Sequence, residues 1–277
     1  MHIPLYQVDA FADRLFTGNP AAVCPLEEWL DEALMQQIAA ENNLSETAFF
    51  VADDARPGHF ALRWFTPGAE VDLCGHATLA SAFVIFNAME FAGDTLIFHT
   101  RSGELVVRRV GSSALQMDFP AWPAARLSSD ESSVIADALG VALGHRPAEV
   151  HRAVNLLAVF DSEETLDSLR YSAALVPALA AADAWGLIAT APAAPDSGRD
   201  FVSRFFAPLK GVDEDPVTGS AHCTLTPYWA QRLGRSRLVG YQASHRGGTV
   251  GCELQGERVL LSGECHQFMQ GTITVPG

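Results

Sequence analysis

Two segments of the chain place a glycine and polar side chains at an expected helix start. The first contains Gly75 and His76, and the second contains Gly219 and Ser220. The first turn of a helix exposes unpaired backbone N–H groups and about half a positive charge, and glycine lets an anion approach this backbone closely. The two segments therefore predict a binding site for a carboxylate. The alternative is that the glycines only permit tight turns and that Ser220 only caps its helix.

Three titratable side chains near these segments are candidates for proton transfer or substrate orientation: Glu46, His76 and Asp215. Glu46 precedes an apolar run at 48–51 that is typical of a buried strand, and partial burial would favour the protonated form of its carboxylate. A carboxyl group in such a setting can give and take protons near neutral pH. Each of the three also has an ordinary structural interpretation: an exposed residue at a strand start, a helix cap, and a turn former before Pro216.

An internal repeat indicates how the two helix starts are positioned. Residues 60–66 read FALRWFT before a proline, and residues 201–207 read FVSRFFA before a proline, at an offset of 141 residues. Each copy then leads through a Val-Asp pair to its glycine, where the offset has grown to 144 residues. Two similarly folded halves would explain the repeat. Their equivalent loops could then face each other across a cleft.

Hydrophobic periodicity and turn residues predict the elements around the repeat. A helix is expected at about 27–41, followed by a strand near Glu46. Helices are expected after the two glycines, at 75–87 and 219–233, and Pro227 should kink the second because proline lacks a backbone donor. The other expected strands lie at 4–11, 95–99, 104–110, 114–119, 150–160, 185–190, 237–243, 248–254, 258–262 and 268–275, and the other helices at 129–138 and within 163–181.

Charge and hydropathy exclude several classes of partner. The 277 residues carry a formal net charge of −15. This charge repels nucleic-acid phosphate and anionic lipid, so neither nucleic acid nor a membrane is an expected partner. No apolar run reaches the roughly 20 residues needed to cross a bilayer. The N-terminal residues lack the basic and then apolar pattern of a signal peptide, so a cytoplasmic protein is expected.

The cysteines and histidines show none of the spacings typical of a disulfide framework or a metal site. The five cysteines are odd in number and widely separated, and they form no C-x-x-C pair. None of the nine histidines belongs to an H-E-x-x-H pattern, and the chain contains no G-x-S-x-G, Walker or G-x-G-x-x-G motif. The sequence therefore predicts neither a metal nor a nucleotide cofactor.

Five short segments, taken in order, carry a resemblance to a known family. They are VDAF at 8–11, GNPAAV at 18–23, NNLSET at 42–47, LCGHAT at 73–78 and EDPVTGSAH at 214–222. Together they resemble the phenazine-biosynthesis isomerase (PhzF-like) family, over residues 5 to about 250. A single segment is a weak signal, whereas five in the right order are a strong one.

The resemblance implies a diaminopimelate-epimerase-like α/β architecture. Two pseudo-symmetric domains, expected at 1–122 and 123–277, would each curl a mixed or antiparallel sheet around a central helix. The last strand could return to the N-terminal domain, and the active site would lie in the cleft between the domains. The resemblance also implies a cofactor-independent isomerase, commonly a homodimer, that moves a proton on a small cyclic or aromatic-like carboxylate. In the characterised phenazine enzyme this substrate is a dihydro-hydroxyanthranilate.

The same resemblance assigns roles to the candidate residues. The family's acid/base glutamate corresponds to Glu46, its helix-start histidine to His76 and its polarising aspartate to Asp215. Its contacts to the substrate carboxylate correspond to the backbone at Gly75, Gly219 and Ser220. Glu46 would then move a proton between two atoms on one face of the substrate, while the other side chains orient it and the helix starts bind its carboxylate.

Two alternatives to this isomerase stay open. One is an amino-acid epimerase or racemase of the same fold, and the other is a catalytically silent protein that binds a small carboxylate. The related two-cysteine racemases place a thiol before each helix-start glycine, and here Cys74 and Thr218 occupy these positions. Because one thiol is missing, symmetric two-thiol racemisation is disfavoured. Cys74 could still assist proton transfer, or simply pack as a small buried side chain.

Overall fold

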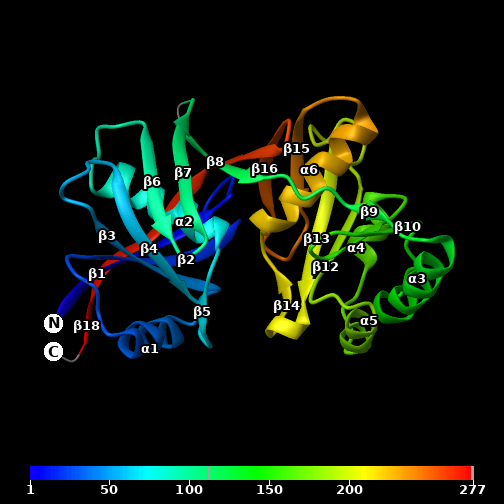
Figure 1. Cartoon of the computed structure of the whole chain (residues 1–277), viewed down its shortest axis with the longest axis horizontal. Helices are drawn as coiled ribbons and strands as arrows, with labels where there is room; N and C mark the ends of the chain where they lie inside the picture. The colour runs from blue at the N-terminus through cyan, green and yellow to red at the C-terminus, as the bar shows by residue number, and fades with distance from the viewer. Residues whose placement is uncertain (112, 276–277) are drawn as a thin grey trace. The chain divides into compact units, whose positions relative to one another are not determined.

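The chain leaves its first structural unit at Phe119 and returns to it at Leu261. In the computed structural model, which describes residues 1–111 and 113–275, unit 1 comprises Met1–Phe119 with Leu261–Gly277 and unit 2 comprises Pro120–Leu260 (Figure 1). Strand β17 (Arg258–Gly263) carries the chain back across this boundary. The last strand, β18 (Cys265–Thr274), therefore belongs to the unit that contains the N-terminus.

Unit 1 is a mixed sheet that curls around one buried helix. Strand pairing gives the order β18–β1–β2–β3–β4–β6–β7–β8, in which β2/β3 and β4/β6 are parallel and the other pairs are antiparallel. Helix α2 (Gly75–Phe83) contacts β1, β2, β3 and β18 (Figure 1). The remaining elements are β1 (His2–Ala10), β2 (Asn19–Leu26), α1 (Glu32–Asn42), β3 (Glu46–Ala52), β4 (His59–Phe65), β5 (Glu70–Val71), β6 (Thr95–Thr100), β7 (Gly103–Val110) and β8 (Ala114–Pro120).

Unit 2 repeats this topology. Its strand order is β9–β10–β11–β12–β13–β15–β16, with parallel pairs at β11/β12 and β13/β15. Helix α6 (Gly219–Leu233) occupies the place in the chain that α2 has in unit 1. The other elements are β9 (Ala125–Arg126), α3 (Ser129–Leu143), β10 (Glu149–Arg152), β11 (Leu156–Val159), α4 (Glu163–Ser168), α5 (Leu175–Ala181), β12 (Leu187–Pro192), β13 (Phe201–Ala207), β14 (Val212–Asp215), β15 (Arg237–Gln242) and β16 (Gly248–Gln255). The prediction of two pseudo-symmetric α/β halves is confirmed.

Three predicted elements differ from the structure in informative ways. The first helix was expected from 27, but α1 begins at Glu32 with Asp31 at its N-cap, because residues 27–31, which follow the end of β2 at Leu26, form a non-helical connection. The strand expected at 150–160 is the antiparallel pair β10/β11. The helix expected at 75–87 keeps α-helical hydrogen bonding only to Phe83 and continues as a π-helical turn at Val84–Ala88.

Pro227 lies inside α6, which runs without interruption from 219 to 233. Proline has no N–H group to offer the carbonyl four residues earlier, so the Cys223 oxygen loses its helical partner. The backbone N–H of Trp122 donates to this oxygen at 2.9 Å. A donor from another segment thus compensates for the proline, and α6 remains a single helix.

Both units fix the approach to their central helix with the same ion pair. Arg63 of β4 donates Nε and Nη2 to the two carboxylate oxygens of Glu70, at 2.7 Å each. Arg204 of β13 binds both oxygens of Glu214 in the same way, at 2.7 and 2.8 Å. The two arginines occupy the same position of the sequence repeat. A planar guanidinium that binds a carboxylate through two parallel hydrogen bonds fixes geometry as well as distance.

Replacing Arg204 by lysine should destabilise unit 2. Lysine keeps the charge, but it cannot form the two parallel hydrogen bonds, and it cannot also reach the Leu166 and Leu169 carbonyls that Arg204 Nη1 binds at 3.2 and 2.8 Å. We expect a loss of about 1–3 kcal/mol in the free energy of unfolding, measured by urea denaturation. Arg146→Lys is the matched control, because its pair with Asp137 is solvent-exposed and should contribute less than about 1 kcal/mol. Equal losses in the two variants would contradict this interpretation.

His222 is a fully buried imidazole in the first turns of α6. Its exposed fraction is 0%, and its Nδ1 lies 2.8 Å from the Thr218 carbonyl oxygen, to which it donates. Burial lowers the pKa of His222 to about 4, because a charged imidazole would lose its hydration. The ring is therefore neutral at physiological pH.

This burial predicts acid sensitivity. In the unfolded chain His222 titrates near 6.5, so between about pH 6.5 and 4 the unfolded state binds a proton that the folded state does not. Stability from this group is complete above the unfolded pKa and falls as the pH falls, by roughly 2 kcal/mol between pH 7 and pH 4.5. His222→Asn, which keeps a donor for Thr218 but does not titrate, should show a correspondingly smaller pH dependence in urea denaturation. The same pH dependence in both proteins would refute the assignment.

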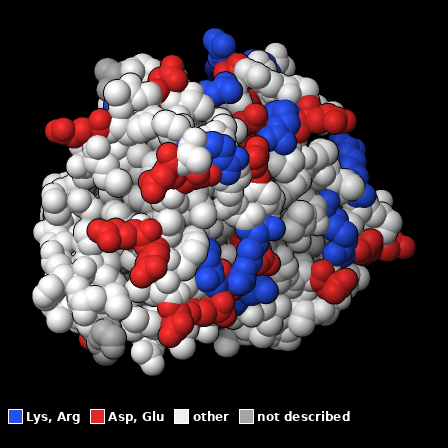
Figure 2. Space-filling view, turned by 60° about the vertical axis from the view of Figure 1, so that its left-hand side comes forward, with Lys and Arg blue, Asp and Glu red and all other residues white. Residues whose placement is uncertain are grey.

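Charged side chains of both signs alternate on the molecular surface. Figure 2 shows acidic and basic groups next to one another on the face that it presents. Ion pairs of the described residues include Arg56 with Asp53 and Arg146 with Asp137.

No helix in the described parts of the chain combines the length and apolar composition needed to cross a membrane. The expected absence of nucleic-acid partners stays a prediction.

Candidate active site

Glu46 and His76 form a largely buried pair in unit 1. Glu46 is the first residue of β3, next to Ala21 of the parallel strand β2, and its side chain is 18% exposed. His76 is the second residue of α2 and is 5% exposed. Glu46 Oε2 lies 3.1 Å from His76 Nε2. The sheet and its central helix thus bring together two side chains that are 30 positions apart in the sequence.

Cys74 completes a group of three titratable side chains. It is the N-cap residue of α2, and its Sγ lies 3.5 Å from His76 Nδ1. Burial, together with the Glu46 carboxylate, raises the pKa of Cys74 to about 11. The thiol is therefore protonated at neutral pH, and it is not a reactive thiolate in the resting protein.

His76 is under two opposing influences. Burial lowers its pKa, but the Cys74 and Glu46 side chains raise it by more, so its pKa lies well above the ordinary value. Because Cys74 is a neutral thiol at neutral pH, the negative charge that matters under these conditions is that of Glu46. The imidazole and the Glu46 carboxyl group lie in direct contact at the start of α2.

The start of α2 offers backbone donors beside this pair. Gly75 is the first helical residue, and the Cys74 side chain accepts no hydrogen bond from the helix. The Cys74 carbonyl instead accepts from Thr78 Oγ1 at 2.6 Å and from the Thr78 N–H at 3.2 Å. The first N–H groups of a helix have no partner within it, so those of this turn can bind an anion.

In unit 2, Asp215 ends β14 and lies four residues before α6. The Thr218 hydroxyl, at the N-cap, donates to Asp215 Oδ2. As in α2, the N-cap side chain accepts no hydrogen bond from the helix, whose first two residues are Gly219 and Ser220. A carboxylate thus lies next to a second glycine-led helix start.

Gln242 holds this arrangement, and it was missed by the sequence analysis. This side chain of β15 is completely buried. Its Oε1 accepts from the Thr218 N–H at 2.9 Å, while its Nε2 donates to the Asp215 carbonyl at 2.8 Å and to Thr218 Oγ1 at 3.1 Å. Strand alternation could have indicated its inward orientation, because Leu238, Gly240 and Gln242 share one face of β15. Its partners lie 24 to 27 residues earlier, beyond the reach of any local pattern.

The predicted site residues therefore form two groups. Glu46, Gly75 and His76 lie together in unit 1, where Glu46 and His76 are in direct contact. Asp215, Gly219 and Ser220 lie at the start of α6 in unit 2. Each group combines a carboxylate with a helix start, which is the chemistry of proton transfer and of carboxylate binding. Their roles on a substrate stay predictions.

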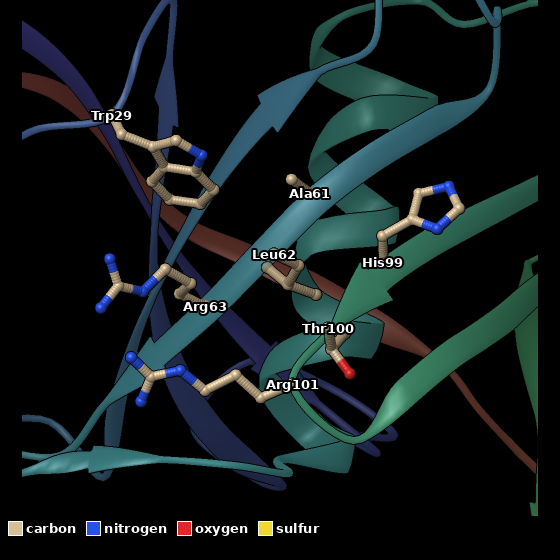
Figure 3. Close-up of a pocket in the computed structure, with 7 residues that line it drawn as sticks. All are labelled: Trp29, Ala61, Leu62, Arg63, His99, Thr100 and Arg101. Carbon is tan, nitrogen blue, oxygen red and sulfur yellow. The ribbon is translucent and has the colours of Figure 1, made fainter.

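Unit 1 has a shallow cavity of about 390 Å³ (Figure 3). It is lined by Trp29, Ala61, Leu62, Arg63, His99, Thr100 and Arg101. Arg63 pairs directly with Phe49 of β3, three residues after Glu46, so strand alternation places Glu46 on the opposite face of the sheet. Arg63 and Arg101 also both bind Glu70, which offsets their charge. This cavity is therefore not assigned to the substrate.

Comparison with known proteins gives one consistent family. The sequence pattern of the family described as "Phenazine biosynthesis-like protein" matches residues 8–271. An uncharacterized isomerase of Pseudomonas aeruginosa is 50% identical over 273 residues, which cover 99% of each chain. The human phenazine biosynthesis-like domain-containing protein is 42% identical, and the match covers 99% of this chain and 100% of the relative.

Solved structures agree with this relationship. The crystal structure of a phenazine biosynthesis protein of the PhzF family from Enterococcus faecalis matches with a TM-score of 0.90 and 45% identity, covering 99% of this chain and 100% of that chain. A family pattern that spans nearly the whole sequence, together with relatives that align from end to end, shows that this chain belongs to the phenazine biosynthesis-like family.

Proposed function

We propose that this chain is a cofactor-independent isomerase that removes a proton from a small carboxylate-bearing substrate and returns it at another position. The observation that carries the proposal is the contact of 3.1 Å between Glu46 Oε2 and His76 Nε2, largely buried at the start of α2. Relatives named as isomerases support an isomerase or epimerase. Cyclic or aromatic-like carboxylates are the substrates that we would test first.

Glu46 is the acid/base group of this proposal. Its side chain keeps an 18% exposed fraction, so a substrate can reach it, while the surrounding apolar strand limits access of water. A carboxylate next to an imidazole can take a proton from carbon, hold it and deliver it elsewhere on the same face. His76, in contact with Glu46, would orient the substrate's heteroatom and stabilise charge on the intermediate.

The backbone N–H groups at the two helix starts would bind the substrate carboxylate. Gly75 opens α2, and Gly219 and Ser220 open α6. Asp215 would polarise the reacting group. Gln242 would hold Asp215 in place through its hydrogen bonds to the Thr218 backbone and hydroxyl.

The state of the cysteine argues against a two-thiol racemase. Cys74 is a protonated thiol with a pKa of about 11, and Thr218 occupies the equivalent position before Gly219. Neither residue supplies a resting thiolate base. A glutamate-based proton transfer therefore fits the side chains better than racemisation by two cysteines does.

Glu46→Gln should abolish proton transfer, because an amide cannot serve as a general base. We expect a loss of about 100-fold or more in deuterium incorporation from heavy water into whichever member of a panel of small carboxylates the wild-type protein exchanges. The control is Glu41→Gln on α1, which changes an exposed glutamate of the same unit and should leave exchange intact. Retained exchange in Glu46→Gln, with loss in Cys74→Ser, would favour the racemase. Carboxylate binding in calorimetry with no exchange in any panel member would favour a silent binding protein.

Asp215→Asn tests whether unit 2 takes part in the same reaction. Removing this negative charge should lower the exchange rate by about 10-fold or more, since the side chain would act on charge that develops in the transition state. Asp213→Asn is the matched control, because Asp213 is an exposed aspartate two residues earlier on β14. If Asp215→Asn exchanges at the wild-type rate while Glu46→Gln is inactive, the participation of unit 2 is wrong.

A further inference from the structure

We propose that Glu46, Cys74 and His76 form a binding site for one Zn²⁺ ion, and that the bound ion inhibits the proton transfer proposed above. The inhibitory part rests on that proposed function, whereas the binding part does not. The ion is here a regulator and not a cofactor, because it would bind the same carboxylate that must move the proton.

The three side chains lie close together at the start of α2. In the described parts of the chain, one potential ligand atom from each residue lies within 4.8 Å of the other two. Glu46 Oε2 is 3.1 Å from His76 Nε2, and Cys74 Sγ is 3.5 Å from His76 Nδ1. A tetrahedral Zn²⁺, with bonds of about 2.0–2.3 Å, holds its ligand atoms roughly 3.3–3.6 Å apart. These two contacts involve different imidazole nitrogens, and only one nitrogen can bind the ion, so binding requires the His76 ring or its neighbours to rearrange.

Two atoms of this cluster lack a hydrogen bond that would compete with an ion. Among the described residues, Glu46 Oε2 and His76 Nε2 are buried polar atoms for which no hydrogen-bond partner has suitable geometry, although they approach each other closely. Buried polar atoms in native proteins are normally hydrogen-bonded, and an exception commonly marks a catalytic group or an ion site. An ion would satisfy both atoms at once.

The ligand types select for a soft or borderline divalent cation. Cys74 would release its thiol proton to solvent when Zn²⁺ binds, and the ligand is then a thiolate. A thiolate and an imidazole favour Zn²⁺ over Mg²⁺ and Ca²⁺, which prefer sets of oxygen ligands. The other four cysteines of the chain, Cys24, Cys223, Cys252 and Cys265, are also buried. None of them belongs to a comparable group within the described residues. An ion can reach Cys74 and His76 past Glu46, whose side chain is 18% exposed.

Inhibition follows from the use of Glu46 as a ligand. Three protein ligands leave one tetrahedral position for water or for a substrate carboxylate. An oxygen that is bound to Zn²⁺ is a poor base, and the ion fills the space into which Glu46 would receive the substrate's proton. Glu46 would thus either accept the proton from the substrate or bind the metal ion, but not both at once.

The binding test uses the full-length protein, stripped with a chelator and titrated with ZnCl₂ in a calorimeter. We expect one ion per chain, and with Co²⁺ as a spectroscopic substitute we expect a near-ultraviolet charge-transfer band from the thiolate. Cys74→Ala should bind Zn²⁺ about 100-fold more weakly and lose the band. Cys24→Ala is the matched control, because it removes another buried thiol of unit 1 and should bind as the wild type does. Glu46→Gln provides a second test. Because an amide oxygen is a weaker ligand than a carboxylate oxygen, this variant should bind Zn²⁺ about 10-fold more weakly than the wild type does.

The possible outcomes separate the two proposals. Absence of binding at one ion per chain in the wild type, or wild-type affinity in a folded Cys74→Ala protein, overturns the metal site. If Cys74→Ala does not fold, wild-type Zn²⁺ affinity in Glu46→Gln overturns the metal site.

In the heavy-water assay, Zn²⁺ should inhibit exchange at the concentration that half-saturates the calorimetric site. Binding without any exchange in the metal-free protein would overturn the isomerase and leave the metal site, whereas unchanged exchange with the site filled would overturn the inhibition.

Discussion

The approach to each central helix depends on a single bidentate ion pair that occurs once in each unit. Arg63 with Glu70 and Arg204 with Glu214 join a long strand to the short strand that leads to the helix. In both pairs the side chains are at most 20% exposed, so water competes poorly for the hydrogen bonds. This constraint fixes the loop whose end sets the position of the first helical turn. The repeat in the sequence is thus also a repeat of the device that positions the candidate groups.

Unit 1 then places three titratable side chains in apolar surroundings, and this placement determines their protonation. The Cys74 thiol stays neutral because burial opposes the thiolate and the nearby Glu46 carboxylate opposes it further. The pKa of His76 lies above its ordinary value because the Cys74 and Glu46 side chains together outweigh the cost of burial. The same environment explains two properties that first seem unrelated. The proposed proton transfer and the proposed zinc site both use this cluster, in which one potential ligand atom from each side chain lies within 4.8 Å of the other two.

Local patterns in the sequence were sufficient for the helix starts and for the topology of the repeat. Gly75 and Gly219 begin α2 and α6, as the turn chemistry before them indicates. The predicted start of α1 was wrong because residues 27–31 form a non-helical connection between β2 and α1, although their residue types continue the pattern of the helix. Gln242 was missed because its role depends on hydrogen bonds to Asp215 and Thr218, which are distant in the sequence and leave no local pattern.

By itself, the sequence determined the twofold repeat and the candidate groups through residue types and spacing, and its resemblance to a known family indicated the family and the fold class. Only the tertiary structure decided that Glu46 contacts His76, that Cys74 is a neutral thiol and that Gln242 supports Asp215. Contact, burial and charge arise where strands distant in sequence pack against one helix, and the free energy of a proton depends on those neighbours rather than on the residues adjacent in the chain.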